Sequence, residues 1–159
     1  MGTKELRRLT RECAMQFLYE TEVQKGPNPD SRALFISNLK QLRNYDDEKI
    51  DTTDSETAYP IDEDYFNKVI VTVESNKEEI DKLLAASTDK WRLDRLSKVD
   101  LAILRLSTAE MLYMDDIPES VSINEAVELA KLFSNDDSGK FINGVLGKIA
   151  REKNVRDER

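Results

Sequence analysis

The stretch of sequence that decides the fold covers residues 118–149 and reads PESVSINEAVELAKLFSNDDSGKFINGVLGKI. Each half carries apolar side chains at helical spacing, so two helices are predicted, each with one face turned to a core. These side chains are Ile123, Ala126, Val127 and Ala130, then Ile142, Val145, Leu146 and Ile149. Ser122 and Glu125 form a capping-box pattern, which predicts where the first helix begins. Residues 135–139 supply turn residues and N-cap candidates before the second helix.

Several residues near the start of the second predicted helix do not follow its apolar stripe. Lys140, Phe141 and Asn143 crowd its first turn, off that stripe. Gly144 and Gly147 stand inside the helix at a cost of roughly 1 kcal/mol each, and close packing between helices is the favoured explanation for both. Residues that break local rules often mark function, so this turn is a candidate binding surface.

The rest of the chain also shows helical spacing, and no strand pattern competes with it. Helices are predicted over residues 3–24, 30–43, 62–74, 77–86 and 93–114, with an acidic loop at 44–60. The 93–114 segment is apolar on most sides, which is typical of a central helix. We therefore predict one domain over residues 1–159 with an all-α fold of about seven helices. Two three-helix bundles, residues 1–90 and 91–159, would meet along the central helix.

The apolar 93–114 segment contains three charged residues that need an explanation. Arg105 and Glu110 are predicted to be buried and to satisfy each other, because a buried charge without a partner is costly. For Asp100 two interpretations stay open. It pairs internally with Arg105 or Lys98, or it is a carboxylate that faces a partner.

Composition excludes several classes of function. The chain has no histidine and one cysteine, so it lacks the commonest general base and the ligands of the usual zinc sites. No P-loop, dinucleotide-binding or serine-hydrolase motif is present. We expect a protein that is not an enzyme, with no catalytic residues, no metal and no cofactor. The lone Cys13, the lack of an apolar run of membrane-spanning length and the lack of a signal-peptide pattern predict a cytoplasmic protein.

The charge of the chain is unevenly distributed. A net charge of −8 opposes general binding to nucleic acid, because phosphate contacts need cations. The first eleven residues nevertheless carry the cations Lys4, Arg7, Arg8 and Arg11. Their only carboxylate is Glu5. This asymmetry predicts a local anion site on a repelling body, and so weak and local binding of RNA. A solvated helix face without a ligand is the alternative for these cations.

Five sequence motifs occur along the chain. They are RECAMQFLY at 11–19, WRLDRL at 91–96, VDLAILRL at 99–106, IPESVSINEAVELAKLF at 117–133 and DSGKFINGVL at 137–146. In these motifs the chain resembles the NusB family of bacterial transcription antitermination factors. The last motif is shared chiefly with the N-terminal domain of rRNA cytosine-C5 methyltransferases. Those enzymes carry a catalytic domain after it, for which we expect no room in this chain.

The resemblance implies an all-helical double bundle that binds the boxA segment of ribosomal RNA leader transcripts and supports transcription of rRNA operons. Its direct protein partner would be NusE, which is also a small-subunit ribosomal protein. Other antitermination factors and RNA polymerase would be indirect partners, and no membrane is involved. Carried over by position, the RNA-binding residues would be Lys4, Arg7, Arg8, Arg11, Asp137, Lys140 and Phe141, the last by stacking on a splayed base. Tyr19 and Asp100 would face NusE.

Two other functions stay open from the sequence. One is an accessory domain that positions ribosomal RNA for a separate methyltransferase, which a neighbouring gene for the catalytic half would indicate. The other is a helical adaptor that binds proteins and no RNA. RNA-binding assays with and without the partner separate it from an antitermination factor.

Overall fold

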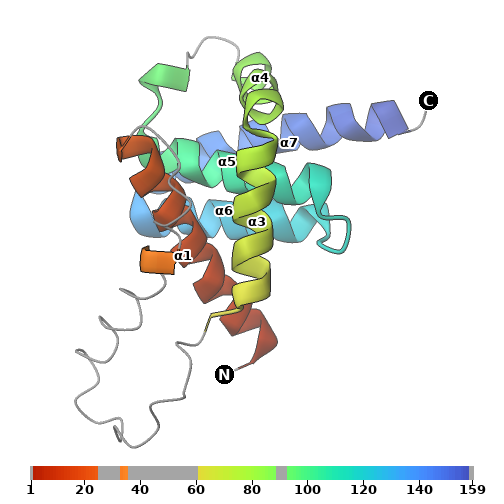
Figure 1. Cartoon of the computed structure of the whole chain (residues 1–159). Helices are drawn as coiled ribbons and strands as arrows, with labels where there is room; N and C mark the ends of the chain where they lie inside the picture. Colours follow the sequence, from red (N-terminus) through yellow and green to blue (C-terminus); the bar gives the residue numbers. More distant parts are fainter. Residues whose placement is uncertain (1, 25–32, 36–60, 89–92, 158–159) are drawn as a thin grey trace, which may run out of the picture.

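The computed structural model describes residues 2–24, 33–35, 61–88 and 93–157 (Figure 1). Its elements are α1 (Thr3–Gln24), α3 (Glu63–Ser75), α4 (Lys77–Ser87), the 3-10 turn η1 (Leu93–Arg95), α5 (Lys98–Tyr113), α6 (Glu119–Phe133) and α7 (Asp136–Asp157). All regular structure in this part of the chain is helical, which confirms the all-α prediction. The predicted helix over 30–43 and acidic loop over 44–60 lie outside the described residues, apart from 33–35, which are helical.

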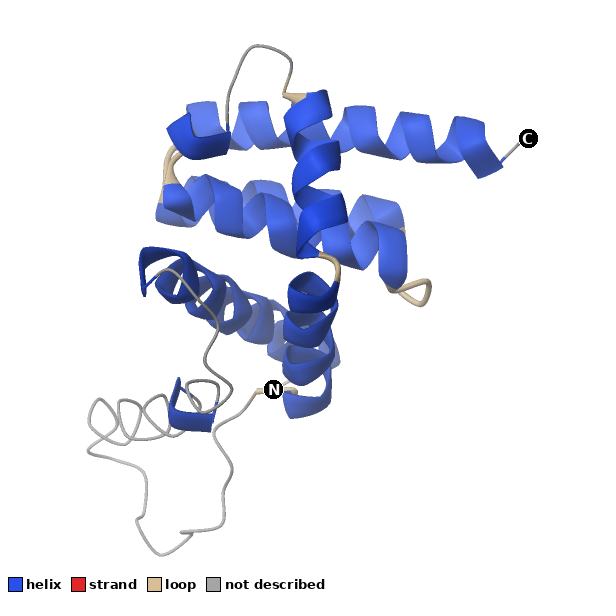
Figure 2. Cartoon of the chain, turned by 45° about the horizontal axis from the view of Figure 1, so that its top comes forward, coloured by secondary structure: helices blue, strands red, loops and turns tan. Residues whose placement is uncertain are grey.

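Helix α5 is the centre of the molecule. It contacts α1, α3, α4, α6 and α7, and residues 100–111 are all buried. The sequence predicted this central role from the apolar residues on most sides of the helix. Figures 1 and 2 show α7 running alongside α6 and extending past it toward the C-terminus. Helix α4 packs against α5 and α7, and the division of the chain into two bundles at residue 90 stays a prediction.

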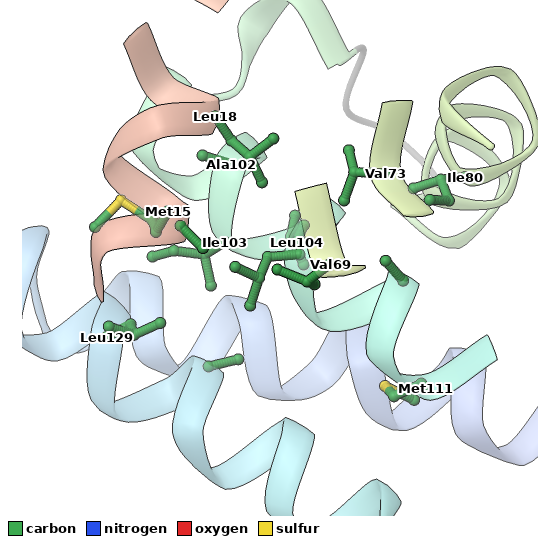
Figure 3. Close-up of a cluster of buried hydrophobic side chains, with 14 of the residues drawn as sticks. Met15, Leu18, Val69, Val73, Ile80, Ala102, Ile103, Leu104, Met111 and Leu129 are labelled. Atoms are coloured by element: carbon green, nitrogen blue, oxygen red, sulfur yellow. The ribbon is translucent and has the colours of Figure 1, made fainter. Parts of the chain in front are cut away.

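One cluster of buried apolar side chains joins these helices. Figure 3 shows Met15 of α1 and Val69 of α3 meeting Ile103 and Leu104 of α5, with Leu129 of α6 close by. Ile103 and Leu104 have no exposed surface. Burying an aliphatic side chain of this size stabilises a fold by roughly 1.5–3 kcal/mol, so α5 supplies much of the cohesion of the whole domain. No helix in the described part of the chain combines the length and apolar character needed to cross a bilayer.

The start of α5 differs from the sequence prediction. The helix begins at Lys98, five residues later than predicted, and residues 93–95 form a separate 3-10 turn. Ser97 sets this boundary, because its hydroxyl accepts a hydrogen bond from the Asp100 N–H at 3.0 Å and so caps the helix. Leu93 and Leu96 still pack against the core from outside the helix. Their apolar character therefore extended the periodic pattern beyond the true helix start.

The start of α6 also differs from the sequence prediction. The helix begins at Glu119, and the carbonyl of Pro118 accepts the first hydrogen bonds, from Val121 and Ser122. Ser122 and Glu125 therefore lie inside the helix, and the predicted capping box is wrong. Ser122 is 1% exposed, and its hydroxyl has no hydrogen-bond partner within the described residues. Glu125 binds Arg8 of α1 instead.

The link between α6 and α7 is shorter than the sequence suggested. Helix α7 begins at Asp136, because the side chain of Asn135 accepts a hydrogen bond from the Ser138 N–H at 2.8 Å. Residues 136–139 therefore form the first helical turn, and Lys140 and Phe141 follow it. The prediction that Gly144 allows close packing against another helix is wrong, because an added Cβ there would meet nothing within 4 Å. Gly139 is packed instead, since its Cβ would lie 3.2 Å from Lys131 Cγ.

Replacing Ser97 before α5 and Ser122 inside α6 tests the corrected starts of these two helices. Ser122→Ala removes an unpaired buried hydroxyl and raises helix propensity by roughly 0.5 kcal/mol, so the thermal midpoint should equal or exceed that of the wild type. Ser97→Ala is the control and should cost about 1 kcal/mol, because it removes a true N-cap. A lower midpoint for Ser122→Ala than for Ser97→Ala would restore the capping-box assignment.

Candidate nucleic-acid interface

The four cations predicted to form one basic face of α1 lie in different environments. Lys4 and Arg8 are exposed, Arg7 is partly buried, and Arg11 is only 4% exposed. The cause is that α3 and α5 both pack on α1, so the buried arc of this helix is wider than its apolar stripe. Arg7 and Arg11 lie on the added part of that arc.

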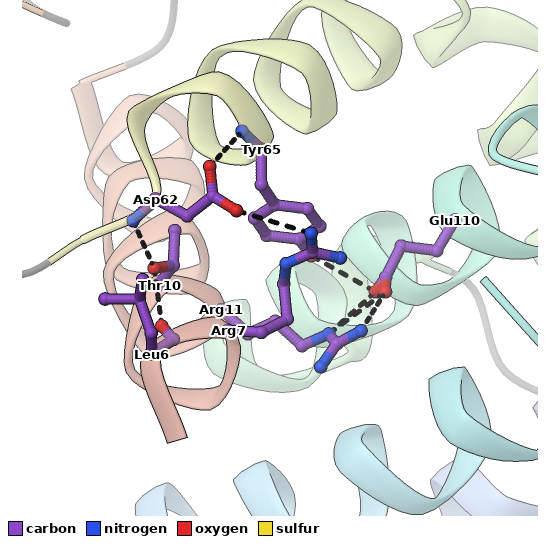
Figure 4. A network of polar contacts seen from close by, with 7 residues as sticks. All are labelled: Leu6, Arg7, Thr10, Arg11, Asp62, Tyr65 and Glu110. Carbon is purple, nitrogen blue, oxygen red and sulfur yellow. Dashed lines mark hydrogen bonds and ion pairs between the residues drawn. The ribbon is translucent and has the colours of Figure 1, made fainter. Parts of the chain in front are cut away.

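Arg11 belongs to the interior of the protein. Its Nη2 lies 2.9 Å from Glu110 Oε1, and its Nε donates to both carboxylate oxygens at 3.0 Å. Tyr65 donates its hydroxyl to the same carboxylate at 3.2 Å (Figure 4). Burial, and after it the charge of Glu110, raises the pKa of Tyr65 well above its ordinary value, so the phenol keeps its proton. The predicted place of Arg11 on an exposed basic face is therefore wrong.

Arg7 is held at the edge of the same network. Its Nη2 lies 3.3 Å from Asp62 Oδ2, and its guanidinium lies 4.3 Å from the centre of the Tyr65 ring (Figure 4). Asp62 in turn caps α3 by accepting a hydrogen bond from the Tyr65 N–H at 3.0 Å, and its own N–H donates to the Thr10 hydroxyl. Arg7 therefore contributes to the joint between α1 and α3, and only part of it is open to a ligand.

Arg8 is exposed but already has an anionic partner. Its Nε and Nη2 donate to the two oxygens of Glu125, each at 3.0 Å. Half of the Arg8 side chain is exposed, against 9% of Glu125. The hydrogen bond from Arg8 lowers the pKa of Glu125, so this carboxylate is ionised at neutral pH. Lys4 is also exposed, and its charge contributes to lowering the pKa of Glu125.

The second predicted patch lies at the start of α7. Asp137 and Lys140 are exposed there, and Phe141 is partly buried against the edge of the core. Asp137 and Phe141 line an open pocket of about 380 Å³ at the junction of α7 with η1 and α5. An aromatic ring at the rim of such a pocket can stack on an unpaired base.

Asp100 lines the same pocket, although the resemblance assigns it to a protein partner and Phe141 to RNA. It is 8% exposed, and its Oδ2 accepts a hydrogen bond from the Ser138 hydroxyl at 3.1 Å. Its Oδ1 is buried and has no hydrogen-bond partner in the described part of the chain. The ion pair predicted as one possibility, with Arg105 or Lys98, does not form there. Tyr19, the other residue assigned to the protein partner, is 38% exposed on α1.

Arg105 and Glu110 are both buried, as predicted, but they do not pair with each other. Arg105 binds Asp81 of α4 through two hydrogen bonds of 2.9 Å and Glu22 of α1 at 2.8 Å. Glu110 binds Arg11 and Tyr65. Residues five apart on a helix point in different directions, so each finds its partners on different neighbouring helices.

No group of three or more histidine, cysteine or carboxylate side chains among the described residues could hold a metal ion. The features brought together in this part of the chain are exposed cations on α1 and, at the start of α7, an aromatic ring beside a pocket with a buried carboxylate.

Comparisons with known proteins converge on one family. The NusB family model matches residues 8–151. The chain is 45% identical over 143 residues to the transcription antitermination protein NusB of Clostridium botulinum, which covers 90% of this chain and 98% of that relative. A crystal form of T. maritima NusB superposes with a TM-score of 0.69 at 33% identity, covering 92% of this chain and 91% of that one.

A second similar structure is described as antitermination factors NusB and NusE in complex with double-stranded RNA. It superposes with a TM-score of 0.69 at 26% identity and covers 93% of this chain and 98% of that one.

The buried pair between α1 and α5 can be tested by removing one charge. Glu110→Gln should destabilise the protein by about 3–5 kcal/mol, because it leaves Arg11 buried without a counter-charge. Urea unfolding measures the change. Lys82→Ala, which breaks an exposed pair with Glu78 on α4, is the control and should leave the unfolding midpoint nearly unchanged. If both variants lower the free energy of unfolding by the same small amount, buried Arg11 does not need the charge of Glu110 as its counter-charge.

Proposed function

Because this chain belongs to the NusB family, we propose that it is a transcription antitermination factor that binds the boxA element of ribosomal RNA transcripts together with NusE. The observation that carries this proposal is the similarity to curated antitermination proteins over 90% of the chain. The similar structure that contains NusB, NusE and RNA supports both kinds of partner. The protein acts by binding, without catalysis, in the cytoplasm where such transcripts are made. Its effect on RNA polymerase is indirect, through the assembled complex.

The proposed RNA-binding surface has two patches. The first is on α1, where Lys4 and Arg8 are exposed and Arg7 is partly open. The second is the start of α7, where Lys140 offers a charge, Phe141 a ring for stacking, and Asp137 a neighbouring carboxylate that limits the approach of phosphate. Arg11 contributes indirectly, because its pair with Glu110 holds α1 against α5.

The proposed NusE-binding surface includes Tyr19 and Asp100. An exposed tyrosine supplies a large, rigid contact at low entropic cost. Asp100 lies in the pocket that Phe141 also lines, so the proposed protein and RNA surfaces adjoin there. A partner seated at this pocket would contact the bound RNA or order the residues that bind it. Adjoining surfaces of this kind give a physical route to coupled binding of the two partners.

The first test measures coupling between the partners. The affinity of the full chain for a boxA-type single-stranded RNA should be low alone and several-fold to about a hundredfold higher with NusE, a coupling of roughly 1–3 kcal/mol. Fluorescence anisotropy of labelled RNA at fixed salt measures both values. An affinity that NusE does not change would contradict the proposed joint function.

The second test separates the two surfaces by mutation. Lys4→Glu with Arg8→Glu should remove most RNA binding and leave the NusE complex intact, because both side chains are exposed on α1 away from the Asp100 pocket. Calorimetric titration with NusE and anisotropy with RNA measure the two interactions. Lys68→Glu with Lys82→Glu makes the same change in net charge on α3 and α4 and is the control. Equal losses in both double variants would mean that net charge, not the α1 patch, controls RNA binding.

A further inference from the structure

We propose that Glu125 masks Arg8, so that RNA gains the full charge of this arginine only by displacing an internal carboxylate. This inference rests on the proposed function, because it concerns the regulation of the same RNA-binding patch. It assigns to Glu125, a residue of α6 far from α1 in the sequence, the role of limiting the affinity of the chain for RNA.

The geometry of the Arg8–Glu125 pair is the first argument. The two hydrogen bonds, from Nε to Oε2 and from Nη2 to Oε1, are both 3.0 Å long. This forked arrangement is also the one that arginine forms with phosphate. Glu125 therefore occupies the edge of the guanidinium that a phosphate would use. A phosphate approaching the remaining Nη1 side meets a cation whose charge is already balanced.

The difference in burial between the two partners is the second argument. Half of the Arg8 side chain is exposed, whereas only 9% of the Glu125 side chain is. The arginine is therefore the partner that can move, and the carboxylate is fixed in the wall between α1 and α6. When Arg8 turns toward a phosphate, the largely buried carboxylate of Glu125 loses its counter-charge. The free-energy cost of this loss opposes the free energy gained from the phosphate contact.

Glu125 also acts on the rest of the α1 patch. Its pKa is lowered first by the hydrogen bond from Arg8, and further by the charges of Arg8, Arg11 and Lys4. The carboxylate is thus ionised and close enough to attract both exposed cations, Lys4 and Arg8. One buried negative charge therefore weakens the attraction of the whole patch for phosphate.

The other arginines of α1 cannot exchange partners in this way. The side chains of Arg11 and Glu110 are 5% and 1% exposed, so Arg11 reaches RNA only if α1 leaves the core. Asp62, the partner of Arg7, also caps α3, and Arg7 lies over the Tyr65 ring as well. Of the three pairs that arginines of α1 form with carboxylates within the described residues, the Arg8–Glu125 pair is the one in which phosphate can replace carboxylate.

The experiment compares two glutamates of α6 that differ in their contact with Arg8. Glu125→Gln keeps the size of the side chain and removes the charge that holds Arg8. Glu128→Gln removes the same charge one turn away, where the carboxylate is exposed and lies 3.9 Å from the Lys131 ammonium. The affinity of each full-length variant for boxA-type single-stranded RNA is measured by anisotropy at fixed salt, with NusE absent and present.

Glu125→Gln should raise the affinity for RNA about fivefold, the upper end of what a partly exposed ion pair contributes. Glu128→Gln should change it less than about twofold, through long-range charge alone. In an Arg8→Ala background the gain from Glu125→Gln should disappear, because there is no longer an arginine to release. If thermal melting shows that Glu125→Gln is not folded, Glu125→Asp replaces it. That variant draws the carboxylate back from Arg8 by one methylene and should raise the affinity in the same direction.

The outcomes separate the two proposals. Equal gains from Glu125→Gln and Glu128→Gln, or a gain that persists without Arg8, overturn the masking while leaving the proposed function in place. If the wild type and all variants bind no boxA-type RNA even with NusE, the proposed function is wrong. The proposed masking of Arg8 by Glu125 is then wrong as well.

Discussion

A helix that is buried on every side must obtain partners for its own charged residues from its neighbours, and α5 carries two such residues in its middle. Arg105 reaches Glu22 of α1 and Asp81 of α4, and Glu110 reaches Arg11 of α1 and Tyr65 of α3. Helix α1 is thereby tied to α5 by ion pairs at its middle and near its C-terminal end, as well as by apolar packing. A shift of α1 along α5 by one turn would separate both pairs and leave buried charges unpaired.

This constraint determines what α1 presents to solvent. Arg11 is buried in the interior, and most of the Arg7 side chain is covered in the contact with α3, so two of the four clustered cations serve packing first. What is left for phosphate is Lys4 and Arg8, and Glu125 from α6 already binds one of them. For a chain of net charge −8 with so small an accessible patch, we expect weak binding to RNA alone and propose that a partner supplies further contacts.

The start of α7, which directly follows α6 in the chain, is the second patch of the proposed RNA-binding surface. Its first turn is capped by Asn135, which aims Phe141 at a pocket that also holds the carboxylate of Asp100. The RNA and protein surfaces implied by the family resemblance therefore meet at one place. Coupling between two ligands requires that each alters the free energy of binding the other, and we propose that this shared pocket is where the coupling arises.

The sequence by itself determined the helical class, the family and the central position of α5, because these depend on local periodicity and on contiguous motifs such as residues 117–133. It placed the start of α6 incorrectly, since the Ser122–Glu125 pattern is the same inside a helix as at its end. Tertiary structure alone decided which cations are available. Arg8 and Glu125 are 117 positions apart, and Arg11 and Glu110 are 99 apart. Charge pairing acts through space over a few ångströms, so no local pattern shows which arginine is bound internally and which is left for RNA.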